Sequence, residues 1–171
     1  INNITDLAGK SIALDALTTG FAFVLLDMLD SAGVNRSDVE FVAVGATPQR
    51  WQSVKDGHHA ATLTIEPFTS LARFEGFNVV AKSTDFYSEY QGGVIVTTRS
   101  LLANQPEKAE AFIESYLEGL NWVLDPANED DAKRLLGSQM PQIKPKAMTA
   151  VMNSLTSPKS GLTPSAALLD K

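Results

Sequence analysis

The residues best suited to bind a polar group form a short turn between an apolar segment and a long helix. Asp15, Thr18, Thr19 and Gly20 follow the apolar run 11–14, and a helix with regularly spaced apolar residues starts at about Thr18. The first turn of a helix leaves about four backbone N–H groups without internal partners and carries partial positive charge. The turn therefore predicts a site for an anionic or strongly polar group. The alternative is that Thr18 or Thr19 caps the helix.

Strands and helices alternate over residues 1–98. The pattern predicts strands over 11–14, 39–44, 60–65, 77–81 and 92–98, and helices over 18–33, over 48–56 with Thr47 as its N-cap, and from Glu66-Pro67-Phe68 through Phe74. This alternation predicts an α/β fold with a mainly parallel sheet and helices on both faces. From residue 100 the chain is predicted to be helical only, which indicates a second structural unit. Its longest helix is expected to follow an Asn104 cap and to carry an apolar stripe from Ala109 to Leu124.

Further candidates follow from where ligands bind in such sheets, beyond the carboxyl ends of the strands. Glu66 follows the third predicted strand, and Tyr90 and Gln91 precede the fifth. Glu66 suits a cationic or amide group of a ligand, or it is a carboxylate favourably placed at a helix N-terminus. Tyr90 either stacks on a ligand or packs within its loop. With the Thr18–Gly20 turn, these residues predict a small-molecule pocket of hydroxyl groups, a carboxylate and aromatic walls.

Composition excludes several classes of protein. The chain has no cysteine and a net charge of −6, and its Lys and Arg residues are scattered, which argues against nucleic acid as a partner. His58-His59 is expected in a solvated turn at the far end of the sheet, so no metal site is predicted. The chain has no Gly-x-Ser-x-Gly elbow, phosphate-binding loop or dinucleotide fingerprint. We therefore expect neither a cofactor nor enzymatic activity. No run approaches the roughly 20 apolar residues of a membrane-spanning helix.

Several short motifs follow one another along the chain in a recognisable order. They are Asp6-Leu7-x-Gly9-Lys10, Asp38-Val39-Glu40-Phe41-Val42, Gly57 before Ala61-Thr62-Leu63, Glu66-Pro67-Phe68, Gly92-Gly93-Val94-Ile95-Val96 and Asn104-Gln105-Pro106-Glu107. Their order and spacing resemble extracytoplasmic solute-binding proteins of ABC transporters, in the nitrate/sulfonate/taurine and pyrimidine-precursor (NMT1/THI5-like) branch. The chain departs from that pattern at His59, a position that is commonly apolar, and at Ala60, where the family often has Asp.

The resemblance implies a fold like that of type II periplasmic binding proteins. Residues 1–90 would be the complete second α/β lobe. Residues 91–171 would be the return strand and the helical C-terminal part of the first lobe. The N-terminal half of that first lobe would be missing from this sequence.

The resemblance also implies a function. Such a protein captures a small polar or anionic solute between its lobes and delivers it to the membrane permease of an ABC transporter, in the periplasm or another extracytoplasmic location. Thr18, Thr19 and Gly20 would donate to the solute, while Glu66, Tyr90 and Gln91 would shape specificity. Surfaces left open by the missing half would favour a homodimer. The alternatives are a biosynthetic enzyme of the pyrimidine or menaquinone pathway type on the same scaffold, and the ligand-sensing domain of a regulator.

Overall fold

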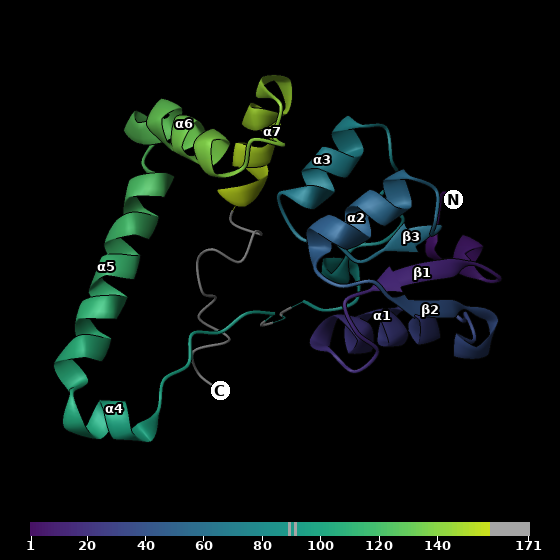
Figure 1. The fold of residues 1–171 in the computed structure, drawn as a ribbon, viewed down its shortest axis with the longest axis horizontal. Coiled ribbons are helices and arrows are strands. Elements are labelled where there is room, and N and C mark those ends of the chain that lie inside the picture. Colours follow the sequence, from purple (N-terminus) through teal and green to yellow (C-terminus); the bar gives the residue numbers. More distant parts are fainter. Residues whose placement is uncertain (89, 91, 158–171) are drawn as a thin grey trace. The chain divides into compact units, whose positions relative to one another are not determined.

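The structure is a computed structural model that describes residues 1–88, 90 and 92–157. The chain forms two compact units, Ile1–Tyr90 (unit 1) and Gln91–Lys171 (unit 2). Unit 1 contains a small parallel sheet with helices on both faces, and unit 2 is helical in its described part (Figure 1). The predicted α/β class is confirmed.

The sheet of unit 1 has three parallel strands in the order β2-β1-β3. They are β1 (Ser11–Leu14), β2 (Glu40–Ala43) and β3 (Ala61–Thr62), and the helices that follow them are α1 (Gly20–Ser31), α2 (Thr47–Lys55) and α3 (Phe68–Phe74). Ile12 of the central strand pairs with Phe41 on one side and Ala61 on the other. Because β1 is central, the turn that leads from it into α1 starts at the middle of the carboxyl edge of the sheet.

The core of unit 1 follows from the alternation of side chains along β1. Ile12 and Leu14 point to the same face and are buried in one cluster with Leu25 and Leu29 of α1. Ala13, which points to the opposite face, is also fully buried. Both faces of the central strand are therefore covered, as expected for a parallel sheet.

Three predicted strands differ from the structure. The third is shorter than expected because two backbone carbonyls accept hydrogen bonds from side chains: the Leu63 carbonyl from Arg50 and the Ala13 carbonyl from the Thr62 hydroxyl. Residues 77–81 form no strand. Val80 packs against the core without joining the ladder, and the side-chain amide of Asn78 donates a hydrogen bond to the Ile1 carbonyl. Residues 92–98 also form no strand, and the side chains of 94–96 are exposed.

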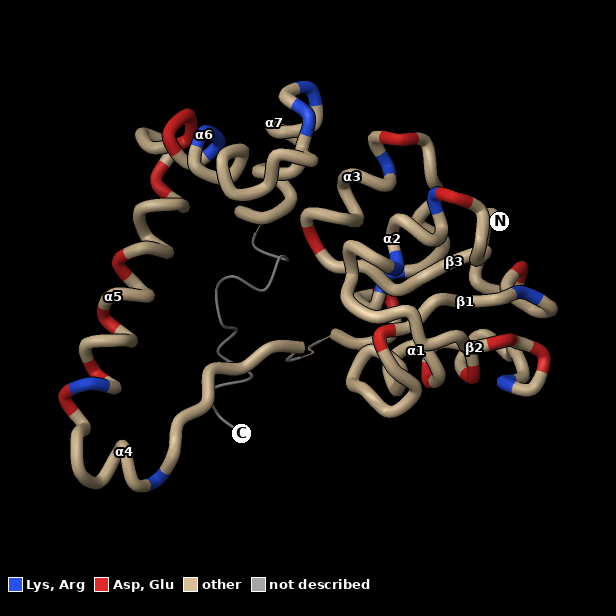
Figure 2. The backbone as a smooth tube through the Cα atoms, in the orientation of Figure 1, with Lys and Arg blue, Asp and Glu red and all other residues tan. Residues whose placement is uncertain are grey.

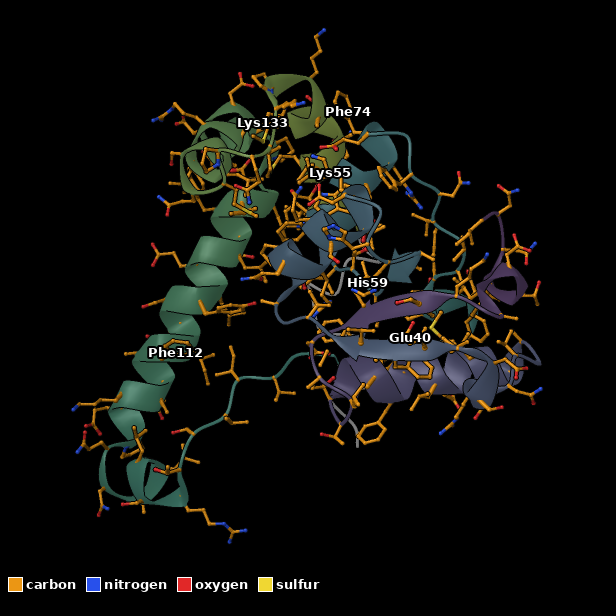
Figure 3. All side chains as sticks on the ribbon, turned by 45° about the vertical axis from the view of Figure 1, so that its right-hand side comes forward. Glu40, Lys55, His59, Phe74, Phe112 and Lys133 are labelled. Carbon is orange, nitrogen blue, oxygen red and sulfur yellow. The ribbon has the colours of Figure 1, made fainter. Side chains whose placement is uncertain are left out.

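Unit 2 contains α4 (Arg99–Asn104), α5 (Pro106–Leu124), α6 (Glu129–Gln139) and α7 (Pro145–Leu155), with a short turn at Pro126–Asn128. Buried side chains gather on and beside α6 and α7: Ala132, Ile143, Ala147, Val151 and Met152. Helix α5 has no buried residue, and most of its large apolar residues, among them Phe112 (Figure 3), are exposed.

The helix starts differ from two predicted caps. Asn104 ends the unexpected helix α4, where its amide donates to the Ser100 carbonyl, and Gln105 is the residue that precedes α5. Thr47 is the first residue of α2 rather than its cap, a position that Ala46 holds. In both cases, the threonine or asparagine side chain has a different partner from the backbone N–H groups that a cap would bind.

Candidate functional site

The turn after β1 is held by hydrogen bonds of Thr19. The Thr19 hydroxyl accepts a hydrogen bond from the Ala22 backbone N–H (3.2 Å) and donates one to Asp15 Oδ1 (2.7 Å). Thr19 is thus the N-cap of α1, which is the capping role that the sequence left open for Thr18 or Thr19. Thr18 and Gly20 are exposed at the same helix end, so a hydroxyl and unpaired backbone N–H groups face solvent there.

Asp15 is the anionic member of this turn. Burial raises the pKa of its carboxyl group, but hydrogen bonds from the Thr19 hydroxyl and from the backbone N–H groups of Ala16 and Asp15, together with the charge of Arg50, outweigh that effect. The pKa therefore lies below its ordinary value, and Asp15 is ionised at neutral pH. By accepting these hydrogen bonds, the carboxylate stabilises the turn.

The most buried charged group at this end of the sheet is Arg50, on α2, with 1% of its surface exposed. Its guanidinium donates to the carbonyl oxygens of Gly45 (2.8 Å) and Leu63 (3.1 Å), which follow β2 and β3. It also donates to the hydroxyls of Thr47 (3.0 Å) and Thr62 (3.2 Å). Arg50 thereby joins the carboxyl ends of two strands to the start of α2.

The pKa of Arg50 lies below its ordinary value. Burial lowers the pKa of the guanidinium, while the charge of Asp15 acts in the opposite direction. The guanidinium carbon lies 5.2 Å from the ring centroid of Phe21 in α1, a cation–π contact. Sequence reasoning missed this residue. Its one local signal is a cation in the first turn of a helix, where the helix dipole disfavours positive charge.

The Tyr90 hydroxyl lies beside the start of α1. A Cβ atom at Gly20 would be 3.7 Å from that hydroxyl, so the structure brings Gly20 and Tyr90 together. Tyr90 also faces the ring of Tyr87, with centroids 5.8 Å apart. The Tyr87 hydroxyl donates to the carboxylate of Asp27 on α1, and this bond raises the pKa of Tyr87 to about 12. Residues 83–88 are thus attached to α1 through Tyr87, which the sequence did not single out for this role.

Two further candidates are placed differently. The Glu66 carboxylate accepts a hydrogen bond from the Ser70 backbone N–H (3.3 Å), the helix-terminus role that was its alternative interpretation. Nearby, the hydroxyls of Thr64 and Thr69 bond to each other at 2.7 Å. Gln91 lies outside the described residues.

The remaining features of the two units do not extend this site. His59 Nδ1 lies 2.6 Å from Ser11 Oγ at the start of β1, so the His58-His59 turn is bonded to the sheet rather than fully solvated (Figure 3). Within the described ranges, no group of three or more His, Asp or Glu side chains is placed to hold a metal ion. A cavity of about 50 Å³ under Val80 and one of about 140 Å³ beside α7 are lined by none of the predicted site residues.

The chain has an α/β fold with a three-stranded parallel sheet, and this fold matches half of a type II periplasmic binding protein. The family described as NMT1/THI5 like matches residues 1–129, and the chain belongs to this family. The crystal structure of the periplasmic aliphatic sulphonate binding protein SsuA from Escherichia coli is similar, with a TM-score of 0.51 and 24% identity. That match covers 99% of this chain and 50% of the other, so the chain spans about half the length of that protein. Comparison with curated proteins gave no match.

Among the described helices, none combines the length and apolar character that crossing a bilayer requires.

Proposed function

We propose that this chain is the solute-binding component of an ABC importer and that it binds a small polar or anionic organic solute, of the sulfonate, taurine, nitrate or pyrimidine-precursor class. The observation that carries the proposal is the position of the Thr18–Gly20 turn. It presents a hydroxyl and the free N–H groups of α1 where the central strand ends, with the Tyr90 hydroxyl beside it. Membership of the NMT1/THI5-like family supports the same function.

In this proposal, residues 1–90 form one complete lobe and residues 91–171 contribute to the other. The solute would bind between the lobes, and Glu66, Tyr90 and Gln91 would shape its fit to the Thr18–Gly20 turn. The two compact units, Ile1–Tyr90 and Gln91–Lys171, support this division. An extracytoplasmic location and a membrane permease as partner follow from the same proposal, and the periplasmic location of SsuA supports them.

Titration calorimetry of the protein in its full natural length tests this function. We expect heat of binding with at least one of taurine, ethanesulfonate, nitrate and a pyrimidine. Thr18→Val removes the exposed hydroxyl of the turn and should weaken that binding. Thr97→Val, which removes an exposed hydroxyl in unit 2, is the matched control and should leave binding unchanged. A folded protein that binds none of the four solutes would contradict the proposal.

We also propose that this 171-residue chain forms a homodimer through its exposed apolar surface. Val94, Ile95 and Val96 are 63%, 61% and 82% exposed, and the described part of their segment has no strand partner. Sedimentation velocity should show association that increases with concentration and that Ile95→Lys abolishes. A chain that is monomeric at every concentration would rule the dimer out.

A further inference from the structure

We propose that Arg50 sets the charge preference of the solute site: it offsets Asp15, so that the N-terminus of α1 favours an anionic group over an uncharged one. This inference rests on the proposed function, because it concerns the same site. It adds a named residue and a sign of charge to that function.

The position of Arg50 is the first argument. The four groups that accept its hydrogen bonds lie at or just beyond the carboxyl ends of β2 and β3 or at the start of α2. The guanidinium also contacts the ring of Phe21, in the first turn of α1. The positive charge is therefore fixed at the carboxyl edge of the sheet, next to the first turn of α1. Being 1% exposed, it is poorly screened by solvent.

The second argument is that the turn already carries a negative charge. Asp15 lies between β1 and α1, and its carboxylate is held by the Thr19 hydroxyl. An isolated carboxylate at this point would cancel the partial positive charge of the helix N-terminus and would repel an anion. Asp15 and Arg50 interact electrostatically, and the two unit charges oppose each other. Arg50 thus allows Asp15 to order the turn without making the site anionic.

A purely structural role of Arg50 predicts different effects on binding from a role through its charge. In that case, Arg50 would matter through its four hydrogen bonds, and any variant that lost them would weaken every solute equally. A role through charge predicts instead that variants at Arg50 and Asp15 shift the affinity for an anion in opposite directions. It also predicts that lysine, which keeps the charge but cannot make the same forked hydrogen bonds, preserves the preference for an anion.

The test uses the full natural-length protein and two probes, ethanesulfonate and the uncharged ethyl methyl sulfone. Arg50→Gln should weaken ethanesulfonate binding roughly tenfold, the effect of removing one poorly screened unit charge, and should leave the affinity for the sulfone nearly unchanged. Arg50→Lys should keep the preference for the sulfonate. Asp15→Asn should tighten ethanesulfonate binding.

Arg36→Gln is the matched control, because it removes the same charge from an exposed ion pair with Asp30 in the same unit. It should change neither affinity. Thermal unfolding shows whether each variant is folded. If Arg50→Gln does not fold, Arg50→Lys and Asp15→Asn still decide the question.

The outcomes separate the two proposals. If the wild-type protein binds ethanesulfonate but Arg50→Gln weakens both probes equally, or Asp15→Asn leaves the sulfonate affinity unchanged or weaker, the role of Arg50 is overturned and the proposed function stands. If the folded wild-type protein binds neither these probes nor taurine, nitrate or a pyrimidine, the proposed function itself fails.

Discussion

Helices α1 and α5 have similar apolar patterns but very different surroundings. Helix α1, of 12 residues, buries Ala22, Val24, Leu25, Met28 and Leu29 against the sheet of unit 1. Helix α5, of 19 residues, buries none, and acidic residues recur along its backbone (Figure 2). The difference shows that apolar spacing specifies a helix and its face, whereas burial depends on a partner that is distant in the sequence or absent from it.

The largest effect expected from this comparison is on stability. Leu29→Ala removes a fully buried side chain and should lower the free energy of unfolding of unit 1 by about 2–5 kcal/mol. Leu117→Ala, on the exposed face of α5, should cost less than about 0.5 kcal/mol. Urea unfolding followed by Trp51 fluorescence in a Trp122→Phe background reports on unit 1, and helical circular dichroism reports on α5. Equal losses at the two positions would show that α5 has a buried face after all.

A smaller difference is expected between two helix caps. Thr19 caps α1 and Thr98 caps α4, each through its hydroxyl. Thr19→Ala should lower the free energy of unfolding by about 1 kcal/mol, because an N–H of a packed helix loses its acceptor. Thr98→Ala should cost less, since α4 has no buried residue and its end is solvated. Urea midpoints of the two variants test this order, and a larger loss at Thr98 would reverse it.

Asp15 should contribute to the pH dependence of the stability of unit 1. Its pKa is lower in the folded state than its ordinary value of 3.8, so the unfolded chain binds more protons at acid pH. The stabilisation is therefore complete above about pH 5 and is lost as the pH falls through the folded pKa. Urea midpoints measured from neutral to acid pH should fall less steeply for Asp15→Asn than for the wild type. Parallel curves would mean that Asp15 has the same pKa in both states.

The smallest effect concerns two ion pairs of equal length. Lys55–Glu75 in unit 1 and Arg134–Asp131 in unit 2 both measure 2.8 Å, but the second pair is much more exposed. Glu75→Gln should cost up to about 1 kcal/mol and Asp131→Asn close to nothing, because solvent screens exposed pairs. Thermal unfolding at low and high salt should show a salt-sensitive difference for Glu75→Gln alone.

The parts of the fold that were predictable from sequence are those that depend on residues close together in the chain. β1, α1 and α2 follow from apolar spacing and turn residues, and the parallel arrangement follows from their alternation. The early end of β3 was not predictable, because it depends on Arg50 reaching the Leu63 carbonyl from a different helix. The strand expected over 92–98 has the right composition, but in the described residues no neighbouring strand pairs with it.

In the candidate site, too, local features were predictable from the sequence and long-range contacts were not. The cap at Thr19 is a local feature, so the sequence indicated it from hydroxyl residues before an apolar run. The approach of Tyr90 to Gly20 joins residues 70 positions apart, and the sequence predicted only that both lie near one edge. Arg50 was missed because its role arises from carbonyl groups that converge only after the sheet has formed.

The hydrogen bonds of Arg50 also limit how unit 1 can change during evolution. Its partners fix the lengths of the connections after β2 and β3, because an insertion there would displace the Gly45 or Leu63 carbonyl from the guanidinium. The connection between β1 and α1 meets Arg50 through charge alone and carries no such restriction. Sequence divergence should therefore accumulate in the β1–α1 turn, while loop lengths around Arg50 stay constant among proteins that keep this arginine.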